Sequence, residues 1–206
     1  MLGRLITEIA GLKLANPTML AAGILGLTAS SLRSAVEAGA GAVVTKSVGL
    51  KPREGYPNPT VVQVECGLLN AVGLPNPGIH HFREDIGEAK EAGVPVIVSI
   101  YGYSSEEFAE VAKVATEAGA DALELNVSCP HVEETGAEIG SDPELVAEVV
   151  RKVKKKVSKP VFVKLTPNVA SIAEIAKAAV EAGADAITAI NTVRAMAIEI
   201  ETTRRL

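Results

Sequence analysis

The chain has 206 residues, of which 48% are hydrophobic and 22% charged, a composition typical of a globular protein and not of a disordered one. A net charge of −5, the lack of a basic arm and the absence of tryptophan argue against a nucleic-acid surface built on phosphate contacts and base stacking. Cys66 and Cys129 are the only cysteines, which excludes a disulfide scaffold and a four-cysteine zinc site.

No apolar run approaches the roughly 18 residues of a membrane span, and the N-terminal segment MLGRLITEIAGLKL alternates polar and apolar residues instead of forming a signal sequence. The adjacent His80 and His81 would point about 100° apart on a helix, which is not the spacing of two ligands to one metal ion. We therefore expect a soluble, cytoplasmic α/β protein with no metal site, no membrane association and no nucleic-acid partner.

Taken in chain order, residues 3–16 predict a β-hairpin with its turn near Ala10 and Gly11. The tripeptide Glu-Ala-Gly then recurs at 37–39, 91–93, 117–119 and 181–183, where each copy closes an amphipathic stretch and precedes a short apolar run. A glycine in this position is typical of a helix C-terminus, so each copy predicts a helix, a tight turn and a buried strand. A fifth unit, with a helix near 143–157, has the same order without the tripeptide. The predicted strands are 18–22, 42–45, 94–99, 122–126, 160–165 and 186–191.

Three helix starts carry a capping-box pattern, in which a serine is followed three residues later by a glutamate. The pairs are Ser104 with Glu107, Ser141 with Glu144, and Ser171 with Glu174. Between the predicted helices the apolar strands are short and nearly continuous, without antiparallel alternation. This pattern favours a parallel sheet covered by helices.

Such a sheet is either doubly wound or a barrel. The predicted strands end in polar residues. In a barrel, the ends of many strands contribute such residues to one active site at the rim. In a doubly wound sheet, the ligand-binding groups lie instead at a single switch point of the strand order. The polar residues are Lys46, Ser47, Ser99, Asn126, Lys164, Asn191 and Thr192. We therefore predict a TIM (β/α)8-type barrel with about six βα units, preceded by the N-terminal hairpin. A closed barrel needs about eight units, so we expect the single domain, residues 1–206, to be incomplete at its C-terminus.

Residues 51–78, between the second strand and the second helix, form a long proline-rich insertion, and a connection of this length is more often functional than filler. Its segment NAVGLPNPG, residues 70–78, offers the side-chain amides of Asn70 and Asn76 between stiff turns. Paired amide donors and acceptors suit a planar polar ligand, although turn residues in an ordinary loop explain the same composition.

Lys46 and Lys164 lie at the ends of apolar strands, where a lysine is costly unless it is paired or used. Each is a Schiff-base nucleophile, a fixed cation for an anionic ligand or cofactor, or a rim lysine that reaches solvent. Cys129 follows the fourth strand in the sequence NVSCP and is either a nucleophile or thiolate base, or a small buried hydrophobe. Cys66 has no such setting, and we expect it to pack in the interior.

Four motifs lie in order on these strand ends: NAVGLPNPG at 70–78, NVSCP at 126–130, VKLTPN at 163–168 and INT at 190–192. Together they resemble the flavin-dependent dihydroorotate dehydrogenases, and the similarity runs from the hairpin to the last residue. A cysteine in the NVSCP loop is similar to the cytosolic class 1 enzymes, since the membrane-associated class 2 enzymes have serine there. The continuation, residues 131–144, is most similar to the class 1B catalytic subunit, which pairs with an iron–sulfur, FAD-containing electron-transfer subunit that reduces NAD.

The resemblance implies the FMN-dependent oxidation of dihydroorotate to orotate in de novo pyrimidine (UMP) biosynthesis. It implies that Cys129 takes a proton from C5 of dihydroorotate while C6 passes a hydride to N5 of FMN. The implied substrate-binding residues are Lys46, Asn70, Ala71, Val72, Gly73, Leu74, Asn126, Asn191 and Thr192. The implied FMN-binding residues are Ala22, Lys46, Ser47, Ser99, Asn126, Lys164 and Ile190, with Ser99 standing where many relatives have asparagine.

The resemblance further implies an assembly, either a homo-oligomer or a heterotetramer with the electron-transfer subunit. Because the family's glycine-rich phosphate-binding segment lies on the seventh and eighth strands, we expect residues 1–206 alone to bind FMN poorly. Two alternatives stay open: an inactive or partner-completed barrel fragment, and a Schiff-base barrel aldolase that uses Lys46 or Lys164. Dihydropyrimidine dehydrogenase and the tRNA dihydrouridine synthases are neighbouring flavin barrels, and the negative net charge argues against the latter.

Overall fold

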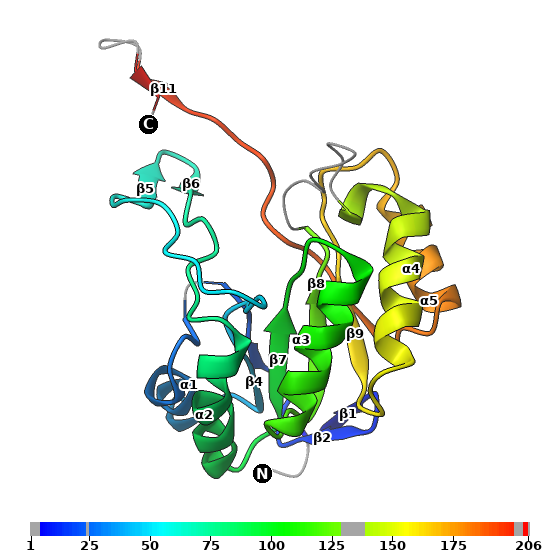
Figure 1. The fold of residues 1–206 in the computed structure, drawn as a ribbon. Coiled ribbons are helices and arrows are strands. Elements are labelled where there is room, and N and C mark those ends of the chain that lie inside the picture. Colours follow the sequence, from blue (N-terminus) through cyan, green and yellow to red (C-terminus); the bar gives the residue numbers. More distant parts are fainter. Residues whose placement is uncertain (1–4, 24, 129–138, 200–203, 206) are drawn as a thin grey trace.

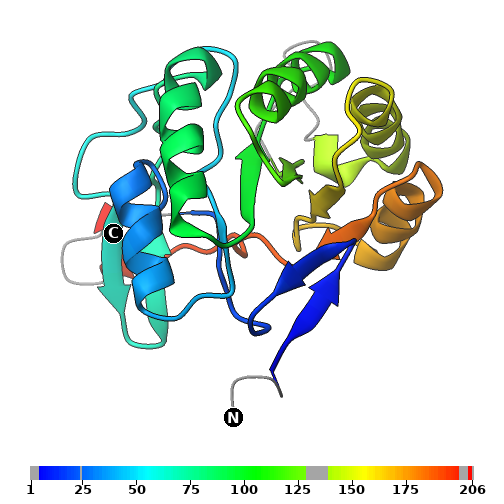
Figure 2. The same cartoon turned by 90° about the horizontal axis from the view of Figure 1, so that it is seen from below.

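A computed structural model describes residues 5–23, 25–128, 139–199, 204 and 205 of the chain (Figure 1). Its centre is a parallel six-stranded sheet in the order β10-β9-β8-β7-β4-β3. The strands are β3 (Met19–Leu20), β4 (Ala42–Val44), β7 (Val96–Ile100), β8 (Ala122–Asn126), β9 (Val161–Lys164) and β10 (Ala186–Thr188). Figure 2 shows the sheet curving, with the helices in an arc on its outer side. This confirms a partial TIM-type barrel with six parallel strands and the five α-helices that connect them, in which β3 and β10 are the edges of a sheet that does not close within the described residues.

Three of the five α-helices between these strands end where the repeated tripeptide predicts. The five α-helices are α1 (Ala29–Glu37), α2 (Ile79–Ala89), α3 (Ser105–Glu117), α4 (Pro143–Lys154) and α5 (Ile172–Glu181), with short 3-10 helices η2 (Lys90–Ala92) and η3 (Ile139–Ser141). Helices α1, α3 and α5 each end at the glutamate of Glu-Ala-Gly, and the glycines Gly39, Gly119 and Gly183 have φ of 102°, 106° and 106°. Glycine has no Cβ to clash in this conformation, so it stops the helix and turns the chain into the next strand.

Two of the three predicted helix caps are confirmed. The hydroxyls of Ser104 and Ser171 each accept a hydrogen bond from the backbone N–H of the glutamate three residues later, at 3.2 and 3.4 Å. The prediction for Ser141 is wrong, because the carboxylate of Asp142 caps α4 and accepts from two backbone N–H groups of its first turn. Pro143 favours the first helical position, which makes the residue before it the cap.

The sheet separates two apolar layers. On its outer side, alternate strand residues pack under the helices and form the main core; they include Val43, Val98, Ile100, Leu123, Leu125, Val161 and Val163. On its inner side lies a smaller cluster of Val44, Ile97, Ala122 and Phe162. Burial on both faces explains why the strands are nearly continuous apolar runs.

The N-terminal hairpin covers one end of the interior. Its strands, β1 (Thr7–Ile9) and β2 (Leu12–Leu14), pair antiparallel around the predicted turn at Ala10 and Gly11, which both have positive φ. Residues of both strands pack against the inner cluster, which lies at the start of the sheet strands. The opposite, carboxyl end of the strands is therefore the end that is left for a site.

The 51–78 insertion contains a second antiparallel hairpin, formed by β5 (Val61–Val64) and β6 (Gly67–Asn70), which projects beyond the carboxyl ends of the strands (Figure 1). The sequence pattern does not predict this pair, because these short strands are largely exposed and their two-residue turn, Glu65 and Cys66, lacks the glycine that marks such turns. Cys66 is exposed in that turn, so the expectation that it packs in the interior is wrong.

After β10 the chain leaves the sheet and leads to a short antiparallel pair, β11 (Ile198–Glu199) and β12 (Arg204–Arg205) (Figure 1). The segment before β11 carries exposed apolar side chains, among them Val193 and Met196. None of the helices in the described part of the chain is long and apolar enough to cross a membrane.

Candidate active site

A cavity of about 850 Å³ opens at the carboxyl ends of the strands. Its wall contains every residue predicted to bind substrate or cofactor except Ser99. These residues are Ala22, Lys46, Ser47, Asn70, Ala71, Val72, Gly73, Leu74, Asn126, Lys164, Ile190, Asn191 and Thr192. They come from the ends of several strands and from the 51–78 insertion, so the structure brings them together at one barrel rim.

The strand register explains which side chains become neighbours. Asn126 and Lys164 are the last residues of β8 and β9 and pair in the parallel ladder, and Lys164 pairs in turn with Thr188 of β10. Side chains alternate along a strand, so Glu124 and Asn126 both face the interior while Leu125 between them packs under the helices.

Two buried ammonium groups lie in the cavity wall. Lys46 is 5% exposed and Lys164 8% exposed. The Nζ atom of Lys164 donates to the backbone carbonyl of Ala22 at 3.4 Å, which uses one of its three N–H bonds. Burial lowers the pKa of Lys46, and the positive charge of Lys164 lowers it further. An anion bound between these groups would relieve their repulsion, so the pair favours a negatively charged ligand.

A series of hydrogen bonds, the polar chain, runs from the cavity wall into the interior. Asn191 Nδ2 donates to Asn126 Oδ1 at 3.1 Å, and Asn126 Nδ2 donates to Ser47 Oγ at 3.0 Å. Ser47 Oγ lies 2.9 Å from Ser99 Oγ. Ser99 Oγ donates to Glu124 Oε1 at 3.3 Å. Ser99 is fully buried, and it connects to the cavity through Ser47 without lining it.

Glu124, at the inner end of the polar chain, is a buried carboxyl that the sequence interpretation missed. Its second oxygen, Oε2, accepts from Thr188 Oγ1 at 3.0 Å. Burial raises the pKa of Glu124, while the charge of Lys164 and the two hydroxyl hydrogen bonds act in the opposite direction. A charged residue inside the apolar strand ALELN was the available signal, since such a residue is costly to bury without a role.

The 70–78 loop forms one wall of the cavity, and its two asparagines differ in role. The buried Asn76 amide donates to the Leu74 carbonyl at 2.9 Å and to the Tyr101 hydroxyl at 3.0 Å. Its oxygen accepts from the backbone N–H of Gly78 at 2.9 Å. Asn76 therefore holds the loop in shape, and only Asn70 of the pair lines the cavity.

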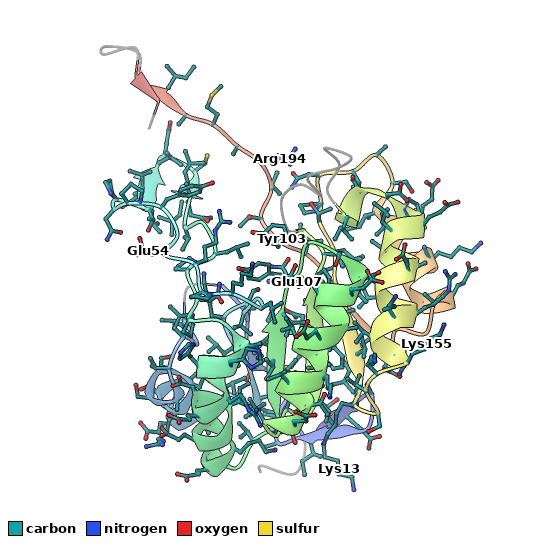
Figure 3. All side chains as sticks on the ribbon, in the orientation of Figure 1. Lys13, Glu54, Tyr103, Glu107, Lys155 and Arg194 are labelled. Atoms are coloured by element: carbon teal, nitrogen blue, oxygen red, sulfur yellow. The ribbon has the colours of Figure 1, made fainter. Side chains whose placement is uncertain are left out.

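Arg53, also in the insertion, supports the same loop. Its Nε donates to the Gly73 carbonyl at 2.8 Å, and its Nη1 donates to the Tyr103 hydroxyl at 3.0 Å. Arg53 lines the cavity, as does Arg194, which Figure 3 labels on the segment that leaves β10. The sequence interpretation missed both arginines, because no local pattern distinguishes them from other surface arginines.

The NVSCP loop begins where β8 ends. Ser128 lines the cavity, and its buried Oγ has no hydrogen-bond partner among the residues that the structure describes. An unsatisfied buried hydroxyl is costly, so this atom points to a ligand that would complete it. Cys129, the predicted catalytic residue, follows directly but lies outside the described residues.

The sequence model of the dihydroorotate dehydrogenase family matches residues 4–206. The chain belongs to this family. Similar relatives are dihydroorotate dehydrogenase B (NAD(+)) catalytic subunits from Methanosarcina mazei, Methanocella arvoryzae and Methanocaldococcus jannaschii, with identities of 57%, 53% and 52%. The alignments cover 96%, 97% and 94% of this chain but 63%, 65% and 64% of those proteins. The chain thus spans less than two thirds of the length of these relatives.

Membership in the dihydroorotate dehydrogenase family confirms the resemblance drawn from the four motifs. All four contribute to one cavity, through the 70–78 loop, the end of β8, Lys164 at the end of β9, and the residues 190–192 that follow β10. The same membership does not favour the Schiff-base aldolase alternative.

Proposed function

We propose that this chain forms the catalytic site of an FMN-dependent dihydroorotate dehydrogenase, which oxidises dihydroorotate to orotate in de novo pyrimidine biosynthesis. The observation that carries the proposal is the single cavity in which two buried lysines meet the amides of Asn126 and Asn191. The similarity to catalytic subunits named dihydroorotate dehydrogenase B supports the same activity.

The cavity suits a flavin together with a planar carboxylate substrate. Its volume of about 850 Å³ falls within the range of small-molecule and cofactor sites. The wall is rich in N–H donors from lysines and amides, which match the carbonyl edge of a flavin and the carboxylate of dihydroorotate. The unpartnered hydroxyl of Ser128 adds a further group for a ligand to complete.

When bound, FMN supplies the hydride acceptor for the reaction. The residues that would hold it are Ala22, Lys46, Ser47, Asn126, Lys164 and Ile190, whereas Ser99 would act on it only through Ser47. Lys164 is suited to stabilising an anionic ligand because its ammonium group is buried, where charges interact more strongly than they do in water.

The residues that would hold the substrate are Lys46, Asn70, Ala71, Val72, Gly73, Leu74, Asn126, Asn191 and Thr192. Asn126 and Asn191 each commit one amide hydrogen to the polar chain. Cys129 Sγ, as the thiolate, would accept the proton from C5 of dihydroorotate while the hydride leaves C6. The two hydrogens lost in this way create the C5–C6 double bond of orotate.

We also propose that the chain works with an electron-transfer subunit that carries an iron–sulfur cluster and FAD and passes electrons to NAD. The names of the relatives, which specify a catalytic subunit and NAD(+), support this arrangement. The assembly would be a heterotetramer of the two kinds of subunit, with a homo-oligomer of this chain as the alternative.

A visible absorption spectrum of the purified protein, recorded before and after anaerobic addition of dihydroorotate, tests the proposal. With FMN added to saturation, we expect a flavin band that bleaches when dihydroorotate is added. Orotate, the product, should perturb the band without bleaching it and serves as the control. A flavin band that dihydroorotate leaves unchanged would contradict the proposed activity, and a colourless protein that takes up no added FMN would contradict flavin binding by this chain.

A further inference from the structure

We propose that Glu124 is a positioning residue of this site, whose carboxylate sets the direction of the polar chain so that Asn126 and Asn191 present N–H donors to the substrate. This inference rests on the proposed function, because the ligand concerned is the substrate or product of that reaction. Glu124 is not among the residues that line the cavity, so it acts through the residues between.

The direction of the polar chain follows from the chemistry of its members. A carboxylate oxygen only accepts hydrogen bonds, so the Ser99 hydroxyl must donate to Glu124 Oε1. Its single hydrogen is then used, and Ser99 Oγ accepts from the Ser47 hydroxyl 2.9 Å away. Ser47 has in turn given its own hydrogen, so its Oγ accepts from Asn126 Nδ2.

The amide of Asn126 is oriented as a result. Its Nδ2 faces Ser47, and its Oδ1 accepts from Asn191 Nδ2 at 3.1 Å and from the Ser128 N–H at 3.3 Å. Asn191 Oδ1 accepts from the Thr192 N–H at 2.8 Å. Each asparagine keeps one amide hydrogen with no partner among the described residues, and both line the cavity. The site therefore offers donors, which selects a ligand with carbonyl or carboxylate oxygens.

Protonation of Glu124 removes this constraint. A proton on Oε1 would be donated to Ser99, and the hydroxyls and amides beyond it would be free to turn round. Burial raises the pKa of Glu124 and brings this event closer to neutral pH, with the charge of Lys164 acting against it. The charged groups on the surrounding strands are Lys164 on β9 and Lys46 after β4, while β7 and β10 contribute the hydroxyls of Ser99 and Thr188.

The first test measures the affinity of the FMN-loaded protein for orotate, read from the change in the flavin band. The proteins compared are the wild type, Glu124→Leu, Ser99→Ala and the double variant. Each single substitution is expected to weaken binding about tenfold, the upper range for one hydrogen bond. The double variant should bind no more weakly than either single variant, because both substitutions break the same chain. The proposal would be overturned if the losses of orotate affinity in the two single variants added up in the double variant. It would also be overturned if either single variant bound orotate within about twofold of the wild-type affinity.

Glu124→Gln supplies a second readout, which a merely structural role would not move. Its amide oxygen still accepts from Ser99, but the side chain no longer titrates. Wild-type affinity for orotate should fall as the pH is lowered through the raised pKa of Glu124, whereas the affinity of the variant should stay level. The same pH dependence in both proteins would overturn the proposal.

Glu88→Gln makes the same chemical change at an exposed position of α2 and should behave as the wild type does in both experiments. If Glu124→Leu fails to fold, Ser99→Ala and Glu124→Gln still decide the outcome. A wild-type protein that does not bind orotate would overturn the proposed function and this inference with it. A wild type that binds orotate with the same affinity as every variant would overturn the inference alone.

Discussion

Lys46 and Lys164 belong to two strand ends that β7 and β8 separate, yet both side chains are more than nine-tenths buried in the wall of one cavity. After burial itself, the charge of Lys164 is the second cause of the lowered pKa of Lys46. Like charges repel strongly where water is excluded, and an anion between them removes this cost. The pair therefore prepares the cavity for a negatively charged ligand.

We predict that orotate binding is accompanied by proton uptake at alkaline pH. Lys46 loses its proton below the ordinary lysine pKa of 10.5, and a bound anion restores it. Calorimetric titrations in two buffers of different ionisation enthalpy measure the uptake. Lys46→Met should abolish the uptake and weaken binding about tenfold or more. Lys113→Met, at an exposed position of α3, should change neither, and uptake that persists without Lys46 would refute the prediction.

The free energy of unfolding should depend on the ionisation of Glu124. The pKa of Glu124 in the folded state is raised above its ordinary 4.5, so the folded state holds this proton more tightly than the unfolded chain does. The resulting stabilisation is fully present below the ordinary value and is lost as the pH rises through the raised pKa. Urea unfolding from about pH 4 to about pH 8 should therefore show the wild type losing stability relative to Glu124→Gln. A constant difference between the two proteins would contradict a buried titrating carboxyl.

Gly73→Ala should damage the cavity wall. Gly73 has φ of 75°, and a Cβ there would lie 2.8 Å from Tyr56 Cδ2 and 2.9 Å from Tyr56 N. We expect a loss of about 1–3 kcal/mol in the free energy of unfolding, together with weaker orotate binding. Gly87→Ala is the matched control, because a Cβ in α2 meets nothing within 4 Å and should stabilise by about 0.4–1 kcal/mol. Urea denaturation of both variants measures the two free energies of unfolding. A change of the same sign in both would contradict the claim that a Cβ at Gly73 clashes with Tyr56.

Substitution of Asn76 should lower the stability of the fold, whereas substitution of Asn70 should weaken orotate binding. Asn76→Ala leaves the buried hydrogen-bonding groups of the 70–78 loop without their partner, so unfolding should become easier by about 2–4 kcal/mol. Asn70→Ala removes an exposed side chain and should change stability by less than about 0.5 kcal/mol, while orotate affinity falls. Urea unfolding and orotate titration on the same two proteins provide the measurement. An Asn70 variant with unchanged affinity would remove this residue from the proposed substrate site.

Much of the barrel could be predicted from the sequence because its pattern is local and repeated. Each strand buried on both faces is an apolar run, and each Glu-Ala-Gly copy fixes where a helix stops, so β8 lies at the predicted 122–126. The β5–β6 hairpin could not be predicted in this way. Neither of its strands packs in a core, so neither needs the apolar run that marks a buried strand. The cap of α4 depended on the choice between the neighbours Ser141 and Asp142, which Pro143 decides.

The rim residues could be predicted for a related reason, since parallel strands of a barrel end on the same side. Lys46 and Lys164 follow from that rule alone. Ser99 shows its limit, because β7 continues to Ile100, so the serine lies one layer below the cavity instead of in its wall. Arg53 reaches the site through a contact with the carbonyl of Gly73, twenty residues away in the chain, which no local pattern reveals.

A crystal structure of the protein with FMN and orotate tests most directly the claim that the cavity at the carboxyl ends of β4, β8 and β9 is the active site. We predict orotate oxygens within hydrogen-bond distance of Asn126 Nδ2 and Asn191 Nδ2, with both ligands in contact with the two buried lysines. Orotate bound elsewhere, for example in the separate cavity of about 480 Å³ beside Tyr103 and Glu107, would contradict it.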